Sequence, residues 1–216
     1  MSRPTSNGQL AFDLDEMIHE LDVQNAAAWD GAPLHFTTAY HSPDDLEAAF
    51  ERWVFEHGNF GCLQRSHMWH PGITTAHANT ATAGHELRIF DVDLRCDHYR
   101  ENCACVGGSL TRGICHPCTW HHDGTETGVV EAWHDHAWPG WRTLPVIPAK
   151  IAKTDDQNRP SKKYRAWIEE HYPAEWQLPG APVITERSRY GTRHVPGRSP
   201  WNGFDLSHTA THPTGA

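Results

Sequence analysis

The feature that most constrains this chain is a cysteine cluster, because four of its six cysteines lie within residues 103–118, in the segment CACVGGSLTRGICHPC. Cys115 and Cys118 have two residues between them, a spacing at which a tight turn directs two thiolates at one tetrahedral cation. The two glycines of VGGSL can turn a hairpin and bring Cys103 or Cys105 back opposite this pair. The pattern therefore predicts a structural Zn²⁺ site.

The remaining ligands are left open by the sequence. His134 and His136 follow the cysteines in a predicted helix, at nearly the separation from Cys118 that ββα zinc fingers use. Because side chains at i and i+2 of a helix point away from each other, at most one of these histidines should bind the same ion. Two ions are a further alternative. The candidate ligands are Cys115 and Cys118, one of Cys103 and Cys105, and one of Cys96, His134 and His136.

The alternatives to a metal are a disulfide framework, a catalytic thiol and a redox pair. The first residues, MSRPTSNGQLAFDLDE, contain no apolar run typical of a signal peptide, and no stretch of the chain is apolar enough to span a bilayer. We therefore expect a protein of the reducing cytoplasm, where lasting disulfides are rare. The C-x-x-C of Cys115 lacks the strand-to-helix context of thioredoxin-type motifs, which makes a redox pair the lesser alternative.

Charge is unevenly distributed along the chain. The net charge is −9, but residues 1–141 carry −13 and residues 142–201 carry +5, and every Lys lies in the second segment. This balance excludes an all-over basic coat for nucleic acid. The basic segment is either a solvated tail that folds back onto the acidic part of the chain or a strip that binds phosphates, with nearby tryptophans as core residues or as stacking platforms for bases. The candidate nucleic-acid residues are Arg187, Arg189, Arg193, Arg198, Trp138 and Trp141.

Hydrophobic periodicity predicts both helices and strands. The strongest prediction is a helix from Pro43 that Ser42 caps and Gly58 ends, with apolar residues on one stripe. Further helices are predicted around Met17, within 127–140 and within 160–173. Alternating residues predict strands at 34–40 and 86–94, the second with Phe90, Val92 and Leu94 on one side.

These elements predict an α+β fold: a small mixed domain with an embedded zinc-knuckle or ribbon-like module and an extended C-terminal arm. No internal repeat is apparent. The predicted boundaries are a disordered N-terminus at 1–9, an α+β domain at 10–148 with the zinc module at about 95–141, a linker at 149–161, a short helix and basic arm at 162–204, and a disordered tail at 205–216.

The 18 histidines raise the alternative of metal catalysis. His67 and His70, together with Asp91 or Asp93, could form a three-ligand catalytic site with an open position for water. No H-E-x-x-H or other hydrolase signature supports this alternative. His121 and His122 are further candidates for such a hydrolase or nuclease site. Most of the histidines, including His77, are expected to be surface or hydrogen-bonded structural residues, and Cys62 a buried small apolar residue.

Four stretches of the chain occur together in a recognisable combination: GNFGCLQRSHMWHPGI, GICHPCTW, HDHAWPGWRTLPV and GTRHVPGRSPW. With them the chain resembles, from about residue 40 to 204, a family of uncharacterised proteins from actinobacteria, their phages and other mobile elements. The resemblance implies a cytoplasmic protein of bacterial or phage origin with a Cys-rich metal-binding segment. It implies no activity and no catalytic residue.

The function expected from these observations is that of a zinc-stabilised, non-enzymatic accessory or regulatory protein of a bacterium or phage. Its partner would be DNA, RNA or a host protein, and not a membrane. One alternative is a metal-dependent hydrolase or nuclease that uses the His-rich loop. Another is an inhibitor of a host enzyme whose acidic N-terminal two-thirds mimics nucleic acid.

Overall fold

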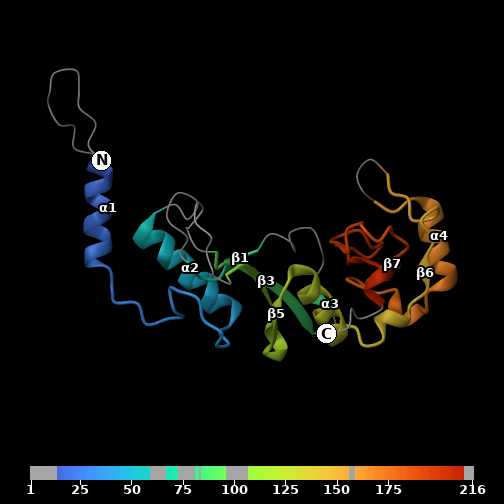
Figure 1. Cartoon of the computed structure of the whole chain (residues 1–216), viewed down its shortest axis with the longest axis horizontal. Helices are drawn as coiled ribbons and strands as arrows, with labels where there is room; N and C mark the ends of the chain where they lie inside the picture. The colour runs from blue at the N-terminus through green and yellow to red at the C-terminus, as the bar shows by residue number, and fades with distance from the viewer. Residues whose placement is uncertain are drawn as a thin grey trace, which may run out of the picture.

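Two small β-sheets and four α-helices make up the described part of the protein, which is a computed structural model. The described residues are 14–58, 67–72, 81–82, 84–95, 107–155 and 159–211. Figure 1 shows α1 at one end of the molecule, α2 and the first sheet next to it, and the second sheet with α4 at the other end. The predicted α+β class is confirmed.

The first sheet is antiparallel, with strand order β1-β3-β4-β5, and β2 also pairs with β3. Its longest pairing joins β3 to β4 in a register that sets Leu87 opposite Cys115. The predicted strand at 86–94 is confirmed as β3. The strands are β1 (His70–Pro71), β2 (Ala81–Thr82), β3 (His85–Asp93), β4 (Ser109–Cys115) and β5 (Trp120–Gly124).

Helix α2 (Pro43–His57) covers one face of this sheet and confirms the strongest sequence prediction. The Ser42 hydroxyl accepts a hydrogen bond from the Asp45 N–H at 3.2 Å, and the Asp45 carboxylate accepts one from the Ser42 N–H. This capping box satisfies N–H groups that have no partner within the helix. The helix ends at Gly58, whose φ of 84° favours glycine.

Helix α3 (Glu126–Ala137) covers the other face of the same sheet and confirms the helix predicted within 127–140. Val130 and Trp133 pack with Leu87 in one core cluster. Gly113 of β4 permits this close approach, because a Cβ there would lie 2.5 Å from Val129 Cγ1. Alternate side chains of β3 therefore pack into two separate cores, one between the sheet and α2 and one between the sheet and α3.

The second sheet has the order β6-β7-β9-β8, with β6, β7 and β9 parallel and β8 antiparallel to β9. Helix α4 (Lys162–His171) confirms the helix predicted within 160–173. It packs Tyr164 and Ile168 into the same core as Trp133, and Trp167 lies against that core. The strands are β6 (Val146–Ile147), β7 (Val183–Thr185), β8 (His194–Val195) and β9 (Asp205–Ser207).

The predicted C-terminal boundaries need correction, because β7 and β8 lie in the segment expected to be an extended arm (162–204), and β9 lies in the expected disordered tail (205–216). The expected linker (149–161) contributes no strand to this sheet, but it packs against the same core. Ile151 of the supposed linker is buried, and Thr154 pairs with Pro160. Phe204 and Leu206 are fully buried in the core that also contains Trp133. One continuous apolar core therefore crosses the expected boundary.

The strand predicted at 34–40 is wrong, since this segment is irregular. Its carbonyl groups bind side chains of the first sheet region instead of another strand. The Trp69 indole N–H donates to the Thr37 carbonyl at 2.9 Å, and the Arg112 guanidinium donates to the carbonyls of Thr38 and Ala39 at 3.2 and 2.8 Å.

Helix α1 (Leu14–Asn25) forms where the N-terminal apolar periodicity predicts it, but none of its residues is buried. Its apolar stripe faces solvent, with exposed fractions between 46% and 68% at Leu14, Met17, Ile18 and Leu21. Phe12 and the predicted disordered N-terminus lie outside the described residues. None of the described helices is long and apolar enough to cross a membrane.

Candidate metal centre

Four side chains that suit a metal ion converge at one end of the first sheet: His85, Cys115, Cys118 and His136. Their ligand atoms all lie within 4.8 Å of one another. In the described part of the chain, no other group of three or more histidine, cysteine or carboxylate residues could hold a metal in this way. The cluster is therefore the candidate metal centre.

Strand pairing brings His85 to Cys115, although 30 positions separate them in the chain. Cys115 is the last residue of β4 and pairs with Leu87 of β3. His85 lies two residues before Leu87, so its side chain leaves the sheet on the same face. Helix α3 covers this face of the sheet and therefore lies over the site.

A tight turn after β4 supplies the second thiol. Residues His116–Cys118 form a single 3-10 turn, and Thr119 adopts a left-handed conformation with φ of 53° before β5 begins. This reversal places Cys118 beside the end of β4, so both thiols face the same histidine. Cys115 is buried and Cys118 is exposed.

His136 comes from the last turn of α3. Its ring stacks on Trp120 at 5.0 Å with an interplanar angle of 6°, and lies edge-on to the His85 ring at 4.8 Å. Its Nε2 is buried and has no hydrogen-bond partner among the described residues. Coordination of a cation would satisfy this nitrogen.

The distances match those of a tetrahedral site. The Sγ atoms of Cys115 and Cys118 lie 3.4 and 3.3 Å from Nδ1 of His85. With metal–sulfur distances of about 2.3 Å and metal–nitrogen distances of about 2.0–2.1 Å, sulfur and nitrogen ligands of a tetrahedral ion lie about 3.6 Å apart. The two Cys–His distances are therefore close to the ligand spacing of a tetrahedral ion.

The electrostatics of the cluster also favour a cation. Burial raises the pKa of the Cys115 thiol, and the neighbouring Cys118 raises it further. Burial lowers the pKa of His136, and the nearby His85 lowers it further. Without a metal these shifts favour a neutral Cys115 thiol and a neutral His136 imidazole, and a divalent cation would supply the charge that stabilises a thiolate.

The predicted ligands other than His134 have two different outcomes. Cys115, Cys118 and His136 lie together in the cluster, whereas Cys96, Cys103 and Cys105 lie outside the described residues. His85 was missed. The hairpin expected from VGGSL would include residues 103–106, which lie outside the described residues. Strand β4 itself runs extended for seven residues and places Ser109 about 20 Å from Cys115.

His134, the other candidate on α3, points into the apolar core and not toward the cluster. Its ring Nδ1 lies 2.7 Å from the Val130 carbonyl, and its ring lies edge-on to Trp133 and Phe204. It is fully buried. The expectation that only one of two histidines separated by two positions could bind agrees with this arrangement.

Burial lowers the pKa of His134 to about 4. The unfolded chain therefore takes up a proton near pH 6.5 that the folded protein does not take up until about pH 4, so stability falls as the pH drops through this window. We expect a loss of about 3 kcal/mol between these limits. His134→Phe should remove this part of the pH dependence in thermal melts. Acid also removes the metal from both proteins, so the test is the difference between the pH profiles of their melting temperatures. Superimposable profiles would contradict the prediction.

The arginines expected to bind nucleic acid are mostly paired within the protein. Arg187 forms an ion pair with the buried Asp205 at 2.6 Å, and Arg193 forms one with Glu131 at 2.6 Å. Arg189 lies over the ring of the exposed Tyr190. Arg198 lies 3.6 Å from Asp205.

The tryptophans of the same candidate set are core residues. Trp141 is fully buried and Trp138 is 7% exposed. The Trp141 indole N–H donates to Asp135 at 2.8 Å, and Trp138 stacks on Trp176. Neither ring presents a face to a nucleobase.

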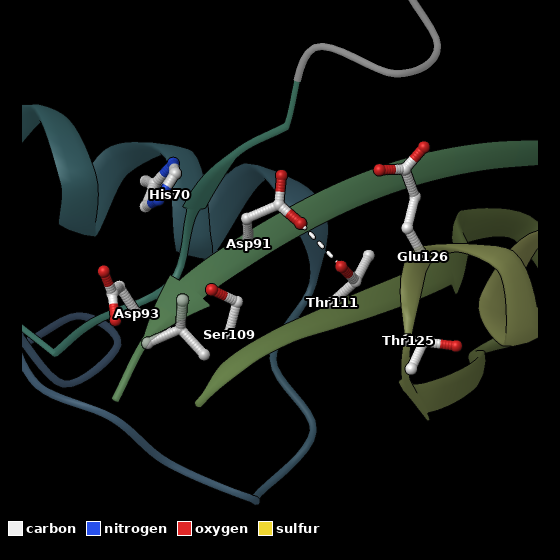
Figure 2. A pocket seen from close by; sticks show the side chains of 8 residues that line it. His70, Asp91, Asp93, Ser109, Thr111, Thr125 and Glu126 are labelled. Atoms are coloured by element: carbon white, nitrogen blue, oxygen red, sulfur yellow. Dashed lines mark hydrogen bonds between the residues drawn. The ribbon is translucent and has the colours of Figure 1, made fainter. Parts of the chain in front are cut away.

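The histidine-rich alternative maps onto a pocket of about 400 Å³ on the first sheet. Figure 2 shows Asp91 in this pocket, joined to Thr111 by a hydrogen bond of 2.7 Å, with His70 and Asp93 nearby. His70 is the β-sheet partner of Asp91. His67 lies three positions before His70, and the Nδ1 atom of His67 contacts the Asp93 carbonyl at 2.7 Å.

The candidate histidines of β5 do not join this pocket. His121 and His122 are exposed on β5, where His121 packs near Tyr40 and His122 stacks on Trp120. His77 and Cys62 lie outside the described residues.

Comparison with known proteins identifies the family. The model of a family of unknown function, DUF6349, matches residues 31–216. The chain belongs to this family. The DUF6349 region contains the whole metal centre and both sheets, whereas α1 precedes it. No curated protein and no solved structure matches the chain. The expected resemblance is thus confirmed as membership of a family of unknown function, and the expected bacterial or phage origin stays a prediction.

Proposed function

We propose that this protein is a zinc-stabilised, non-enzymatic accessory or regulatory protein that acts by binding another protein. The observation that carries the proposal is the convergence of two thiols and two imidazoles in one cluster. Four such ligands fill a tetrahedral Zn²⁺ site, whereas catalytic zinc sites keep one position open for water. A closed site indicates a structural role.

Zinc suits this cluster better than other common cations. Magnesium and calcium prefer oxygen ligands, and none of the four ligand atoms is oxygen. A bound Zn²⁺ would join the start of β3, the β4–β5 turn and the end of α3. Metal binding would therefore contribute directly to the stability of the fold.

A protein partner fits the surface better than nucleic acid does. The net charge is −9, and the arginines of the basic segment are largely neutralised by internal carboxylates. Protein–DNA affinity depends mainly on cations that are free to neutralise phosphates. The buried state of Trp138 and Trp141 removes the expected stacking platforms.

Helix α1 offers the apolar surface that a protein partner would need. Its exposed stripe of four apolar residues is flanked by carboxylates, and the helix has no Lys or Arg. Such a helix fits an apolar groove with a basic rim. A second copy of α1 fits less well, because the acidic flanks would repel each other and the stripe is short for a stable dimer.

Cobalt substitution tests whether the metal centre is closed. Co²⁺ in the cluster should give the absorption of a tetrahedral site with two thiolate ligands, and added azide or imidazole should leave the spectrum unchanged. A spectrum that shifts with these ligands would show an open position and would contradict a purely structural role.

The partner class is tested by two binding measurements. Labelled DNA and RNA should show no saturable binding at low salt; binding that weakens with added salt would favour nucleic acid instead. Ile18→Glu should abolish co-purification of a partner from cell lysate while leaving the melting temperature unchanged, because α1 has no buried residue. Capture of the same proteins by the variant and the native chain would contradict a role for α1.

A metal-dependent hydrolase is the second candidate, and the pocket of Figure 2 is the observation that favours it. In that case His70 and Asp91 would contribute to the reaction. Hydrolysis of a phosphodiester or ester substrate that requires added metal and disappears in His70→Ala would support this candidate over the first.

A further inference from the structure

A second pocket, of about 270 Å³, lies between the end of β7, the loop after it and the turn at 149–152. Two guanidinium groups line it, from Arg187 and Arg198. Glu186 is the one carboxylate of the lining, and its Oε2 accepts a hydrogen bond from the Ala149 N–H at 3.1 Å. The lining therefore carries two guanidinium charges and one carboxylate charge, and the Asp205 carboxylate, which is not part of the lining, pairs with Arg187.

The two arginines differ in how their hydrogen-bonding groups are used. Arg187 donates from Nε to the Thr185 hydroxyl at 3.0 Å, from Nη1 to the Thr192 carbonyl at 2.7 Å and from Nη2 to the Asp205 carbonyl at 2.9 Å. It also forms the 2.6 Å ion pair with the Asp205 carboxylate. The N–H donors of Arg187 are thus used in contacts that hold the fold together.

Arg198 has no hydrogen-bond acceptor among the described residues. Its side chain is only 25% exposed, and its Nε is buried without a partner. The nearest carboxylate oxygen, Oδ2 of Asp205, is 3.6 Å from Nε, which is too long for a hydrogen bond. Buried N–H donors without acceptors are rare in folded proteins, and a bound ion is one of the usual reasons for them.

We propose that this pocket binds a phosphate group, with Arg198 as the main ligand. A guanidinium group presents its N–H donors in a planar fork that matches phosphate oxygens. The hydroxyl groups of Ser188 and Thr192 line the same pocket and can donate further hydrogen bonds. A pocket of about 270 Å³ suits a terminal, dianionic phosphate better than the continuous backbone of a nucleic acid.

The phosphate could come from free inorganic phosphate or from a phosphomonoester, and titrations of the metal-loaded full chain distinguish these sources. Inorganic phosphate, glycerol 2-phosphate and dimethyl phosphate would be titrated by calorimetry at constant ionic strength. We expect saturable binding of inorganic phosphate and of the monoester. The ligand that binds more tightly, inorganic phosphate or the monoester, indicates the source of the bound phosphate group. Dimethyl phosphate, a diester, should not bind, and equal binding of all three would overturn the proposal.

Substitutions test whether Arg198 is the ligand. Arg198→Gln should weaken phosphate binding by about tenfold or more, because it removes a charge-assisted, bidentate contact. Arg189→Gln removes the same charge from the same loop region but outside the pocket lining, and should leave the affinity unchanged. Arg198→Lys keeps the charge and the ion pair to Asp205 and should still weaken binding, which separates a lost ligand from a lost fold. Equal affinities of the Arg198→Gln and Arg189→Gln variants, or no phosphate binding by the native chain, would overturn the proposal.

Discussion

Replacement of His85 by Gln is expected to abolish stoichiometric zinc binding and to lower the melting temperature by about 10 °C or more. His85 lies within 3.4 Å of both cluster thiols, so its loss leaves three ligands and an open position. The free energy of metal binding contributes to the free energy of unfolding, because the site does not exist in the unfolded chain. Zinc content by elemental analysis and thermal melts with and without a chelator are the measurements.

His116→Gln is the matched control for this experiment. His116 lies in the turn between the two cluster cysteines, is exposed and is not part of the cluster. The variant should bind zinc as the native protein does. Cys103→Ser and Cys105→Ser should also keep the metal, because the cluster already has four ligands. Zinc retained by His85→Gln, or lost in either cysteine variant, would show that the ligand set is different.

Arg112→Met is expected to destabilise the protein by about 3–5 kcal/mol, independently of the metal. Arg112 is fully buried, and its guanidinium forms two hydrogen bonds to the Asp123 carboxylate at 2.6 and 2.7 Å. It also lies over the Trp69 ring at 4.6 Å and binds the carbonyls of the 34–40 segment. Its removal leaves a carboxylate and two carbonyl groups without their donor.

Arg88→Met is the control for this substitution. Arg88 lies on the neighbouring strand and pairs with Glu47 of α2, but its side chain is 38% exposed. An exposed pair of this kind contributes about 1 kcal/mol or less. Denaturant unfolding of both variants compares the two values. Equal effects of the two substitutions would mean that Arg112 does not hold the 34–40 segment in place.

Local sequence patterns predicted the features that depend on nearby residues. The capping residues around Pro43 define α2, and the two-residue spacing of Cys115 and Cys118 defines the turn of the metal centre. The i, i+2 argument on α3 allowed only one of its two histidines to bind, which agrees with the position of His136 in the cluster and of His134 in the core. Each of these features depends on residues that are close together in the sequence.

His85 could not be predicted in the same way, because it reaches the cluster through strand register. The strand at 86–94 was predicted, but its pairing with the strand that ends at Cys115 was not. One available signal was the alternation of β3, which places His85 on the same face as Leu87 and Ile89. Without the register, that face could not be assigned to the metal centre.

Two further failures have the same physical origin. The alternation of residues 34–40 is typical of a strand, yet a buried arginine and a tryptophan more than 30 positions away bind its carbonyl groups. The strands of the second sheet are only two or three residues long, and Pro- and Gly-rich segments separate them. Strands of two or three residues are too short to show an alternating pattern in the sequence. Contacts with Trp133 and its neighbours in the core stabilise them instead.

Zinc K-edge X-ray absorption spectroscopy of the purified protein tests the metal centre most directly. The cluster predicts one zinc ion per chain with two sulfur ligands at about 2.3 Å and two nitrogen ligands at about 2.0–2.1 Å. Three or four sulfur ligands would place a cysteine outside the described residues in the site and exclude His85 or His136 from it. Protein that contains no stoichiometric metal, and whose melting temperature a chelator does not change, would contradict the account altogether.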